Sequence, residues 1–243
     1  MKRILVSTSA LLLLVGCGSS DDNSTQPVPP ESARTERPGK QVDPQGEPVQ
    51  ILAFGDSLFA GYGVESDESY PAQLEAALRE RGINASVANA GVSGDTTQAG
   101  RDRLAFTIEA QTTAPDLLIV ELGGNDMLRG IEPEQTRSNV KRMLEIAQEK
   151  GVPVLLFGMR APPNMGKDYV RQYDAIYGDL AKEYGVPLVP FFLESIYQDP
   201  ENFQDDRVHP TPAAIGTLVD ATIDQIIGAF PKELTDNLSV NAE

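Results

Sequence analysis

The hydrophobic positions of the chain form short apolar runs that alternate with longer segments of helical spacing. Five runs have the length of strands, and three of these are apolar at nearly every position. Such runs are typical of strands buried on both faces of a parallel sheet. The predicted strands cover residues 49–57, 83–91, 116–124, 152–160 and 186–192. The pattern therefore predicts a parallel sheet of five strands.

Four further segments repeat their apolar residues every three or four positions, as helices with one buried face do. These predicted helices cover residues 70–82, 134–151, 168–185 and 211–230. Gly82 and Gly151 are typical helix stops, and Pro212 suits a first helical turn. Alternating strands and helices indicate βαβ units with right-handed crossovers. We therefore predict an α/β fold, a doubly wound three-layer α/β/α sandwich.

The N-terminal residues 1–17 have the composition of a targeting segment. Two basic residues precede an apolar run over residues 4–15, which is too short to span a bilayer. The run ends in LVGC, residues 14–17, which resembles a bacterial lipobox. We predict a lipoprotein signal peptide with Cys17 as the lipid anchor, and an ordinary secretory signal is the alternative.

Residues 18–48 are rich in Ser, Asp, Gln, Pro and Gly and contain almost no large apolar side chains. Such a segment cannot bury enough surface to offset its loss of conformational entropy. We predict a flexible tether that holds one folded domain, residues 49–243, away from a membrane. We therefore expect a bacterial cell-envelope protein, anchored on the periplasmic side of the inner or outer membrane, and a monomer.

The charge and the rare residue types exclude several functions. The chain has 36 acidic and 20 basic residues, and its formal net charge of −16 repels nucleic acid. Cys17 is the only cysteine, which excludes a catalytic thiol in the folded domain. His209 is the only histidine, so the several His or Cys ligands of a zinc site are missing. We therefore expect no nucleic acid partner and no metal.

Polar residues collect where the predicted strands end. Ser57 follows the first strand, Gly94 the second and Asn125 the third, and Asp206 and His209 precede the last helix. Each is ordinary alone, but the carboxyl ends of parallel strands meet at one edge of a sheet. Together they supply what acyl transfer needs: a nucleophile in Ser57, a base in His209 and an orienting acid in Asp206. The amides of Ser57 and Gly94, with the Asn125 side chain, can stabilise the oxyanion.

The sequence blocks around these residues resemble those of a known family. GDSL at 55–58, SGD at 93–95, GGND at 123–126 and D-x-x-H at 206–209 are similar in order and spacing to the SGNH, or GDSL-type, esterases and lipases. The resemblance covers about residues 49–230, and longer strings resemble the thioesterase I, lysophospholipase and arylesterase branch. It implies a flavodoxin-like sandwich, hydrolysis of ester or thioester bonds through an acyl-serine intermediate, and neither metal nor organic cofactor.

Several residues near the predicted site need separate treatment. Arg207 stands where that branch commonly has a small residue, and Phe59 where it commonly has a small polar one. Both lie near the predicted site, so the resemblance implies the mechanism but not the acyl-chain preference. We interpret Asp56, Asp126 and Asp205 as structural hydrogen-bonding residues rather than as the acid that orients the base. Apolar residues after the strands could line an acyl pocket or pack in the core: Met127, Leu128, Met159, Pro162, Pro163, Met165 and Tyr169.

The sequence favours a serine esterase that acts on small or medium acyl and aryl esters, with thioesters and lysophospholipids as further substrates. Two alternatives stay open. One is a carbohydrate acetylesterase of the same fold, and the other is a non-catalytic binding protein of the envelope.

Overall fold

The structure of the chain, a computed structural model, describes residues 44–232 and 234. The predicted signal peptide, its Cys17 and nearly all of the predicted tether lie outside the described residues. Strand β1 (Gln45–Gly55) begins before Val49, where we expected the folded domain to start. The expected boundary at residue 48 is too late, because the backbone of β1 already pairs with β2 at Gln45, opposite Ile83.

Five parallel strands form one sheet in the order β2-β1-β3-β4-β5. The strands are β1 (Gln45–Gly55), β2 (Ile83–Gly91), β3 (Leu117–Glu121), β4 (Val154–Phe157) and β5 (Leu188–Val189). This order is the flavodoxin-like arrangement of a doubly wound sheet, so the predicted fold class is confirmed. The last three strands are shorter than predicted at both ends, and the residues that follow them form the loops and the helix α4 at the carboxyl edge of the sheet.

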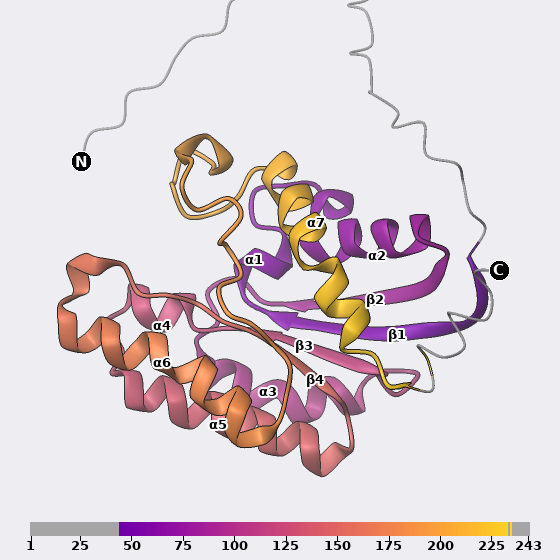
Figure 1. The fold of residues 1–243 in the computed structure, drawn as a ribbon, viewed down its shortest axis with the longest axis horizontal. Helices are drawn as coiled ribbons and strands as arrows, with labels where there is room; N and C mark the ends of the chain where they lie inside the picture. The colour runs from indigo at the N-terminus through magenta and orange to yellow at the C-terminus, as the bar shows by residue number, and fades with distance from the viewer. Residues whose placement is uncertain (1–43, 233, 235–243) are drawn as a thin grey trace, which may run out of the picture. The chain divides into compact units, whose positions relative to one another are not determined.

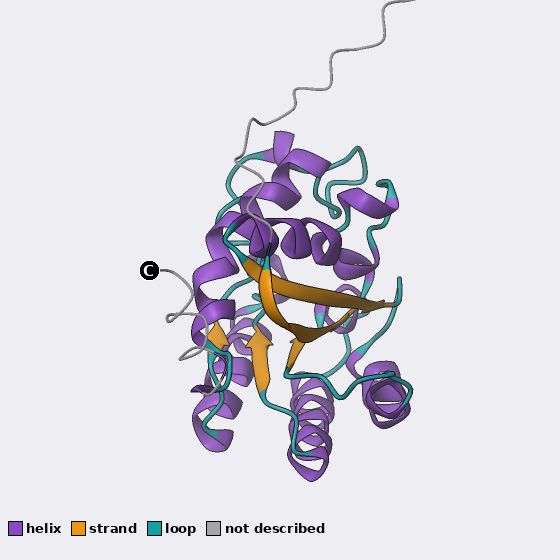
Figure 2. Cartoon of the chain, turned by 90° about the vertical axis from the view of Figure 1, so that its right-hand side faces the viewer, coloured by secondary structure: helices purple, strands orange, loops and turns teal. Residues whose placement is uncertain are grey.

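Helices cover both faces of this sheet (Figure 1), and Figure 2 shows the strands between the two helical layers. Helices α2 and α7 pack together on one side, while α3, α5 and α6 pack on the other. Within the described residues the helices are α1 (Ser57–Ala60), α2 (Tyr70–Glu80), α3 (Thr97–Glu109), α4 (Gly124–Leu128), α5 (Pro133–Lys150), α6 (Lys167–Tyr184) and α7 (Pro212–Gly228), with short 3-10 turns η1 (Ser66–Glu68), η2 (Pro163–Met165) and η3 (Pro200–Asn202). None of these helices combines the length and the apolar character needed to cross a bilayer.

Helix α3 is missing from the helices that we predicted. Its buried positions are Thr97, Gly100, Leu104 and Ile108, so half of the buried face is not strongly apolar. A Cβ at Gly100 would lie 2.2 Å from Leu122 Cδ1. The helix therefore packs closely on the sheet through a glycine, and hydrophobic spacing does not reveal a contact of that kind.

Aromatic packing holds the short helix α1 on the sheet. The Phe59 ring stacks on Tyr70 with 5.0 Å between centroids, and it meets Phe157 and Phe192 edge-on at 6.0 and 5.7 Å. Such pairs add about 0.5–1.5 kcal/mol each beyond the burial of their surface. The first residue of α1, Ser57, is therefore presented from a rigid support.

Candidate active site

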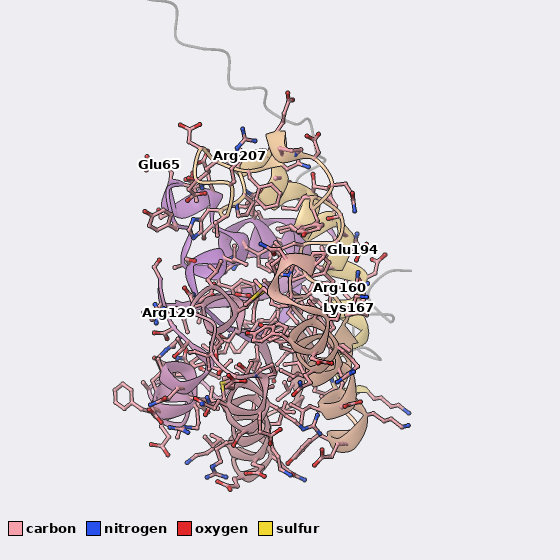
Figure 3. The ribbon with its side chains drawn as sticks, turned by 90° about the vertical axis from the view of Figure 1, so that its left-hand side faces the viewer. Glu65, Arg129, Arg160, Lys167, Glu194 and Arg207 are labelled. Atoms are coloured by element: carbon pink, nitrogen blue, oxygen red, sulfur yellow. The ribbon has the colours of Figure 1, made fainter. Side chains whose placement is uncertain are left out.

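The residues that the sequence analysis singled out lie at the carboxyl ends of the strands. Ser57 begins α1 directly after β1, Gly94 follows β2, and Asn125 belongs to α4 after β3. The strands run toward this face in Figure 1, and Figure 3 looks onto it, with Arg129 and Arg207 labelled. These residues therefore lie at the edge of the sheet where we expected the chemistry.

Ser57, His209 and Asp206 form one chain of hydrogen bonds. His209 Nε2 lies 2.8 Å from Ser57 Oγ, and His209 Nδ1 lies 2.6 Å from Asp206 Oδ2. Because a carboxylate only accepts, Nδ1 carries the hydrogen and the lone pair of Nε2 faces the serine hydroxyl. The arrangement can therefore take a proton from Ser57 Oγ, as an activated nucleophile requires.

The Asp206 carboxylate is fixed by backbone amides as well as by the histidine ring. Its Oδ1 accepts hydrogen bonds from the amides of Val208, at 2.9 Å, and His209, at 3.0 Å. Partial burial raises the pKa of Asp206, but the bonds from His209 and Val208 together outweigh this effect and lower the pKa to about 2. The carboxylate is therefore ionised at neutral pH and can stabilise a positive charge on the ring.

A tight loop over residues 203–210 presents Asp206 and His209 to the site. Its two ends form a β-bridge, and the Gln204 amide donates to the His209 carbonyl at 2.7 Å. Arg207 at its tip has a φ of 61°, in the left-handed region that side chains other than glycine rarely adopt. The loop thus holds a strained backbone conformation beside the histidine, which is common at functional sites.

Two residues that the sequence analysis did not single out hold this loop against the segment after α1. Gln204 Nε2 donates to the Tyr62 carbonyl at 2.9 Å, and the Tyr62 ring stacks on the His209 ring at 4.3 Å between centroids. Gln204 and Tyr62 are 142 positions apart in the chain, so no local pattern could have revealed the contact. The stacking restricts the orientation of the imidazole ring.

Three residues with N–H donors line the pocket beside Ser57 Oγ: Ser57 itself, Gly94 and Asn125. Within the described residues, the amides of Ser57 and Gly94 have no hydrogen-bond acceptor. Gly94 adopts a φ of 84°, and the Arg129 guanidinium donates to its carbonyl at 2.8 Å. Asn125 Nδ2 donates one hydrogen to Asp56 Oδ2 at 3.0 Å, which leaves a second hydrogen for another acceptor. These groups can together stabilise an oxyanion.

The expected structural role of Asp56 and Asp126 is confirmed by their hydrogen bonds. Asp56 accepts from the Leu58 amide at 3.0 Å and from Asn125. Burial raises the pKa of Asp56 to about 6, although these two bonds oppose the shift. Asp126 is buried and accepts from the Thr97 amide at 2.7 Å and from the Thr97 hydroxyl. Both aspartates organise the loops around the site.

A pocket of about 820 Å³ opens beside Ser57 and His209. Most of its wall is apolar, and a volume of this size accommodates an acyl chain or an aromatic ring. Of the apolar residues considered from the sequence, Met127, Leu128 and Met159 line the pocket, whereas Pro162, Pro163, Met165 and Tyr169 do not. Leu193, Tyr197 and Phe203 also line it, although no pattern in the sequence points to them.

The two residues that depart from the family pattern, Arg207 and Phe59, differ in their positions. Arg207 lines the pocket and donates to the Pro200 carbonyl at 3.2 Å. Phe59 does not line the pocket, because its ring is fully buried in the aromatic core. In the part of the chain that the structure describes, no three His, Cys, Asp or Glu side chains gather as metal ligands would.

Comparison with known proteins assigns the chain to a family. The family model described as "GDSL-like Lipase/Acylhydrolase family" matches residues 53–214, the range that holds Ser57, Gly94, Asn125, Asp206 and His209. The chain belongs to this family. Because the chain belongs to this family and its Ser57 is hydrogen-bonded to His209, the protein is a serine esterase, that is, a hydrolase of carboxylic esters.

Named relatives and solved structures agree with this membership. An "Arylesterase" of Vibrio mimicus is 42% identical over 165 residues, which cover 68% of this chain and 82% of the relative. The "Thioesterase 1/protease 1/lysophospholipase L1" of Escherichia coli (strain K12) is 40% identical over 170 residues, 70% of this chain and 79% of the relative. The crystal structure of AlinE4, described as an SGNH-hydrolase family esterase, has 54% identity and a TM-score of 0.66, and covers 77% of this chain and 99% of its own.

Proposed function

We propose that the protein hydrolyses esters with apolar acyl or aryl groups through an acyl-enzyme at Ser57. The observation that carries this proposal is the hydrogen-bonded chain from Ser57 through His209 to Asp206 at the wall of a mostly apolar pocket. A non-catalytic binding protein would have no need for such a proton path. The complete set of donors around the serine further supports an enzyme.

The proposed reaction begins when Ser57 Oγ attacks the ester carbonyl and His209 Nε2 takes its proton. Asp206 keeps the hydrogen on Nδ1 and stabilises the imidazolium that forms. The amides of Ser57 and Gly94 and the Asn125 side chain donate to the negatively charged oxygen of the tetrahedral intermediate. His209 then protonates the leaving alcohol, and a water molecule releases the acyl group by the same steps in reverse.

The substrate class follows from the pocket and from the relatives. The mostly apolar wall favours acyl chains or aromatic rings over the polar sugars of an acetylated polysaccharide. Relatives are named for arylesterase, thioesterase and lysophospholipase activities, so thioesters and lysophospholipids are included in the proposal. Arg207 at the pocket wall supplies a positive charge that suits substrates with an anionic group nearby.

We also propose that the enzyme works at the bacterial cell envelope, held by a lipid on Cys17. The support is the apolar run that ends in the lipobox-like LVGC and the polar segment that follows it. Metabolic labelling with a fatty acid analogue tests this: the wild-type protein should be labelled, and a Cys17→Ala variant should not. Equal labelling of both proteins would contradict the anchor.

The esterase proposal is tested by hydrolysis of p-nitrophenyl esters from acetate to palmitate by a fragment of residues 39–243, which includes the whole described domain. We expect turnover that disappears in a Ser57→Ala variant of unchanged fold, with an optimum longer than acetate because the pocket is large. A best rate on acetate, with faster release from acetylated sugars, would favour the acetylesterase. Equal turnover by Ser57→Ala would refute the mechanism.

A further inference from the structure

Glu121 is a buried acid that the mechanism above does not use. It ends β3, paired with Gly55 of β1 on one side and Phe157 of β4 on the other. Its side chain has no exposed surface, and neither carboxyl oxygen meets a donor in hydrogen-bond geometry among the described residues. An ionised carboxylate there would lack the partners that a buried charge needs.

The neighbour that acts on this carboxyl is Asp56, the residue before Ser57. Asp56 directly follows Gly55, the residue paired with Glu121 in the sheet, and the two carboxyl groups lie close enough for each to shift the pKa of the other. The space between the two strands is small, since a Cβ on Gly55 would lie 3.0 Å from Glu121 Oε2. Two carboxyl groups so close together are stable only when they share a proton.

The environment places that proton on Glu121 rather than on Asp56. Asp56 already accepts two hydrogen bonds, from the Leu58 amide and from Asn125, and both favour its ionised form. Among the described residues no donor meets either oxygen of Glu121 in hydrogen-bond geometry, and the backbone amide of Asp56 is the one group that favours its ionised form. Burial in the first place, and then the negative charge of Asp56, raise the pKa of Glu121 well above its usual value.

Other charged and titratable groups surround the pair without changing this assignment. His209, in the loop that precedes α7, favours the ionised form of Asp56 when its ring carries a proton on both nitrogens. Arg103 on α3 donates to the carbonyl of Gly55 at 3.0 Å, and Gly55 is both the residue before Asp56 and the partner of Glu121 in the sheet. Tyr177 on α6 lies close enough for both acids to raise its pKa.

We propose that Glu121 is a positioning residue of the oxyanion site: it stays protonated and donates to the Asp56 carboxylate, which in turn holds the Asn125 side chain. Glu121 does not line the pocket, so it acts only through Asp56 and Asn125. A neutral donor fixes Asp56 without adding negative charge near the developing oxyanion. The inference rests on the role proposed above for Asn125.

Two substitutions at Glu121 in the full-length protein show whether the hydrogen-bond donor toward Asp56, rather than the carboxyl group itself, is what matters. Glu121→Gln keeps a donor toward Asp56, so we expect kcat within about twofold of wild type. Glu121→Leu removes the donor, and we expect kcat to fall by about 10- to 100-fold with little change in KM, because Asn125 is no longer held. Asp116→Asn is the matched control, since Asp116 is an acid just before β3 that accepts from the Gln50 amide at 2.8 Å and does not line the pocket, so its substitution should leave kcat unchanged.

A double-mutant cycle with Asn125→Ala tests whether Glu121 acts through Asp56 on the Asn125 side chain. In the Asn125→Ala background, Glu121→Leu should cost no further kcat, because the side chain that it positions is already gone. Losses that simply multiply would overturn the proposal, and so would a Glu121→Gln variant as slow as Glu121→Leu. A full-rate Asn125→Ala enzyme would instead contradict the proposed oxyanion role, which makes the two failures distinguishable.

Infrared spectroscopy tests directly whether Glu121 carries the proton. At neutral pH, the infrared spectrum of the wild-type protein should contain the C=O stretch of a protonated carboxylic acid, and Glu121→Gln should lose it. Identical spectra would overturn the proposal. This measurement and the Glu121→Gln kinetics decide the question even if Glu121→Leu fails to fold.

Discussion

Replacing Tyr177 by Phe should reveal how much one buried hydrogen bond to the turn before Asn125 contributes to the free energy of unfolding. Tyr177 Oη donates to the Leu122 carbonyl at 2.8 Å, and Tyr173 Oη donates to the Gly123 carbonyl at 2.6 Å. The two hydroxyl oxygens lie 3.2 Å apart, but each has only one hydrogen, and a carbonyl uses it. Tyr177→Phe therefore leaves the Leu122 carbonyl buried without its donor.

The expected cost is that of an unsatisfied buried acceptor, about 1–3 kcal/mol. The hydroxyl removal opens little space, so a cavity adds little to this value. Gly123 has a φ of 127°, and a Cβ there would lie 2.0 Å from Tyr177 Oη, so the turn is shaped around this hydroxyl. We therefore also expect a lower kcat, because Asn125 follows the turn directly.

Urea unfolding at neutral pH measures the change, with Tyr169→Phe as the matched control on the same helix. Tyr169 Oη donates to the Ile131 carbonyl at 2.9 Å, but the residue is only partly buried, so water can replace the lost donor and the free energy of unfolding should change by less than about 1 kcal/mol. The reasoning would be refuted if the two substitutions lowered the free energy of unfolding equally, or if Tyr177→Phe did not lower it at all.

The remaining predictions concern Asp206. Asp206→Asn should lower kcat by about 10³- to 10⁴-fold in steady-state ester hydrolysis, because an amide no longer enforces the productive histidine tautomer; a loss below tenfold would contradict this. Since the pKa of Asp206 falls from an ordinary value near 4 to about 2 on folding, its contribution to stability should be complete above about pH 4 and lost as the pH falls toward 2. The urea midpoint of Asp206→Asn should therefore decline less steeply than that of the wild-type protein between pH 5 and pH 2. If the two proteins lose stability in parallel, the lowered pKa of Asp206 is contradicted.

The fold and the central site could be predicted because their signals are local. Buried strands are continuous apolar runs, and the blocks around Ser57, Gly94, Asn125 and His209 each follow or precede a predicted element. Helix α3 was missed because Gly100 replaces an apolar residue at its closest contact with the sheet.

Other features depend on contacts between distant parts of the chain. The stacking of Tyr62 on His209 joins two loops that no sequence pattern connects. Glu121 ends an apolar run, and nothing in the sequence marks it as functional; only the pairing of β3 with β1 brings it close to Asp56. Phe59 was placed near the pocket because it follows the nucleophile closely, but the helical turn directs its ring into the core.

The central claim is that Ser57 is the nucleophile, and covalent labelling tests it most directly. The protein is treated with a fluorophosphonate, and the modified peptide is identified by mass spectrometry while the residual esterase activity is followed. We predict one label per chain, on Ser57, with activity lost in proportion to labelling and no label in Ser57→Ala. Inactivation without modification of Ser57, or full activity in a completely labelled protein, would contradict the account.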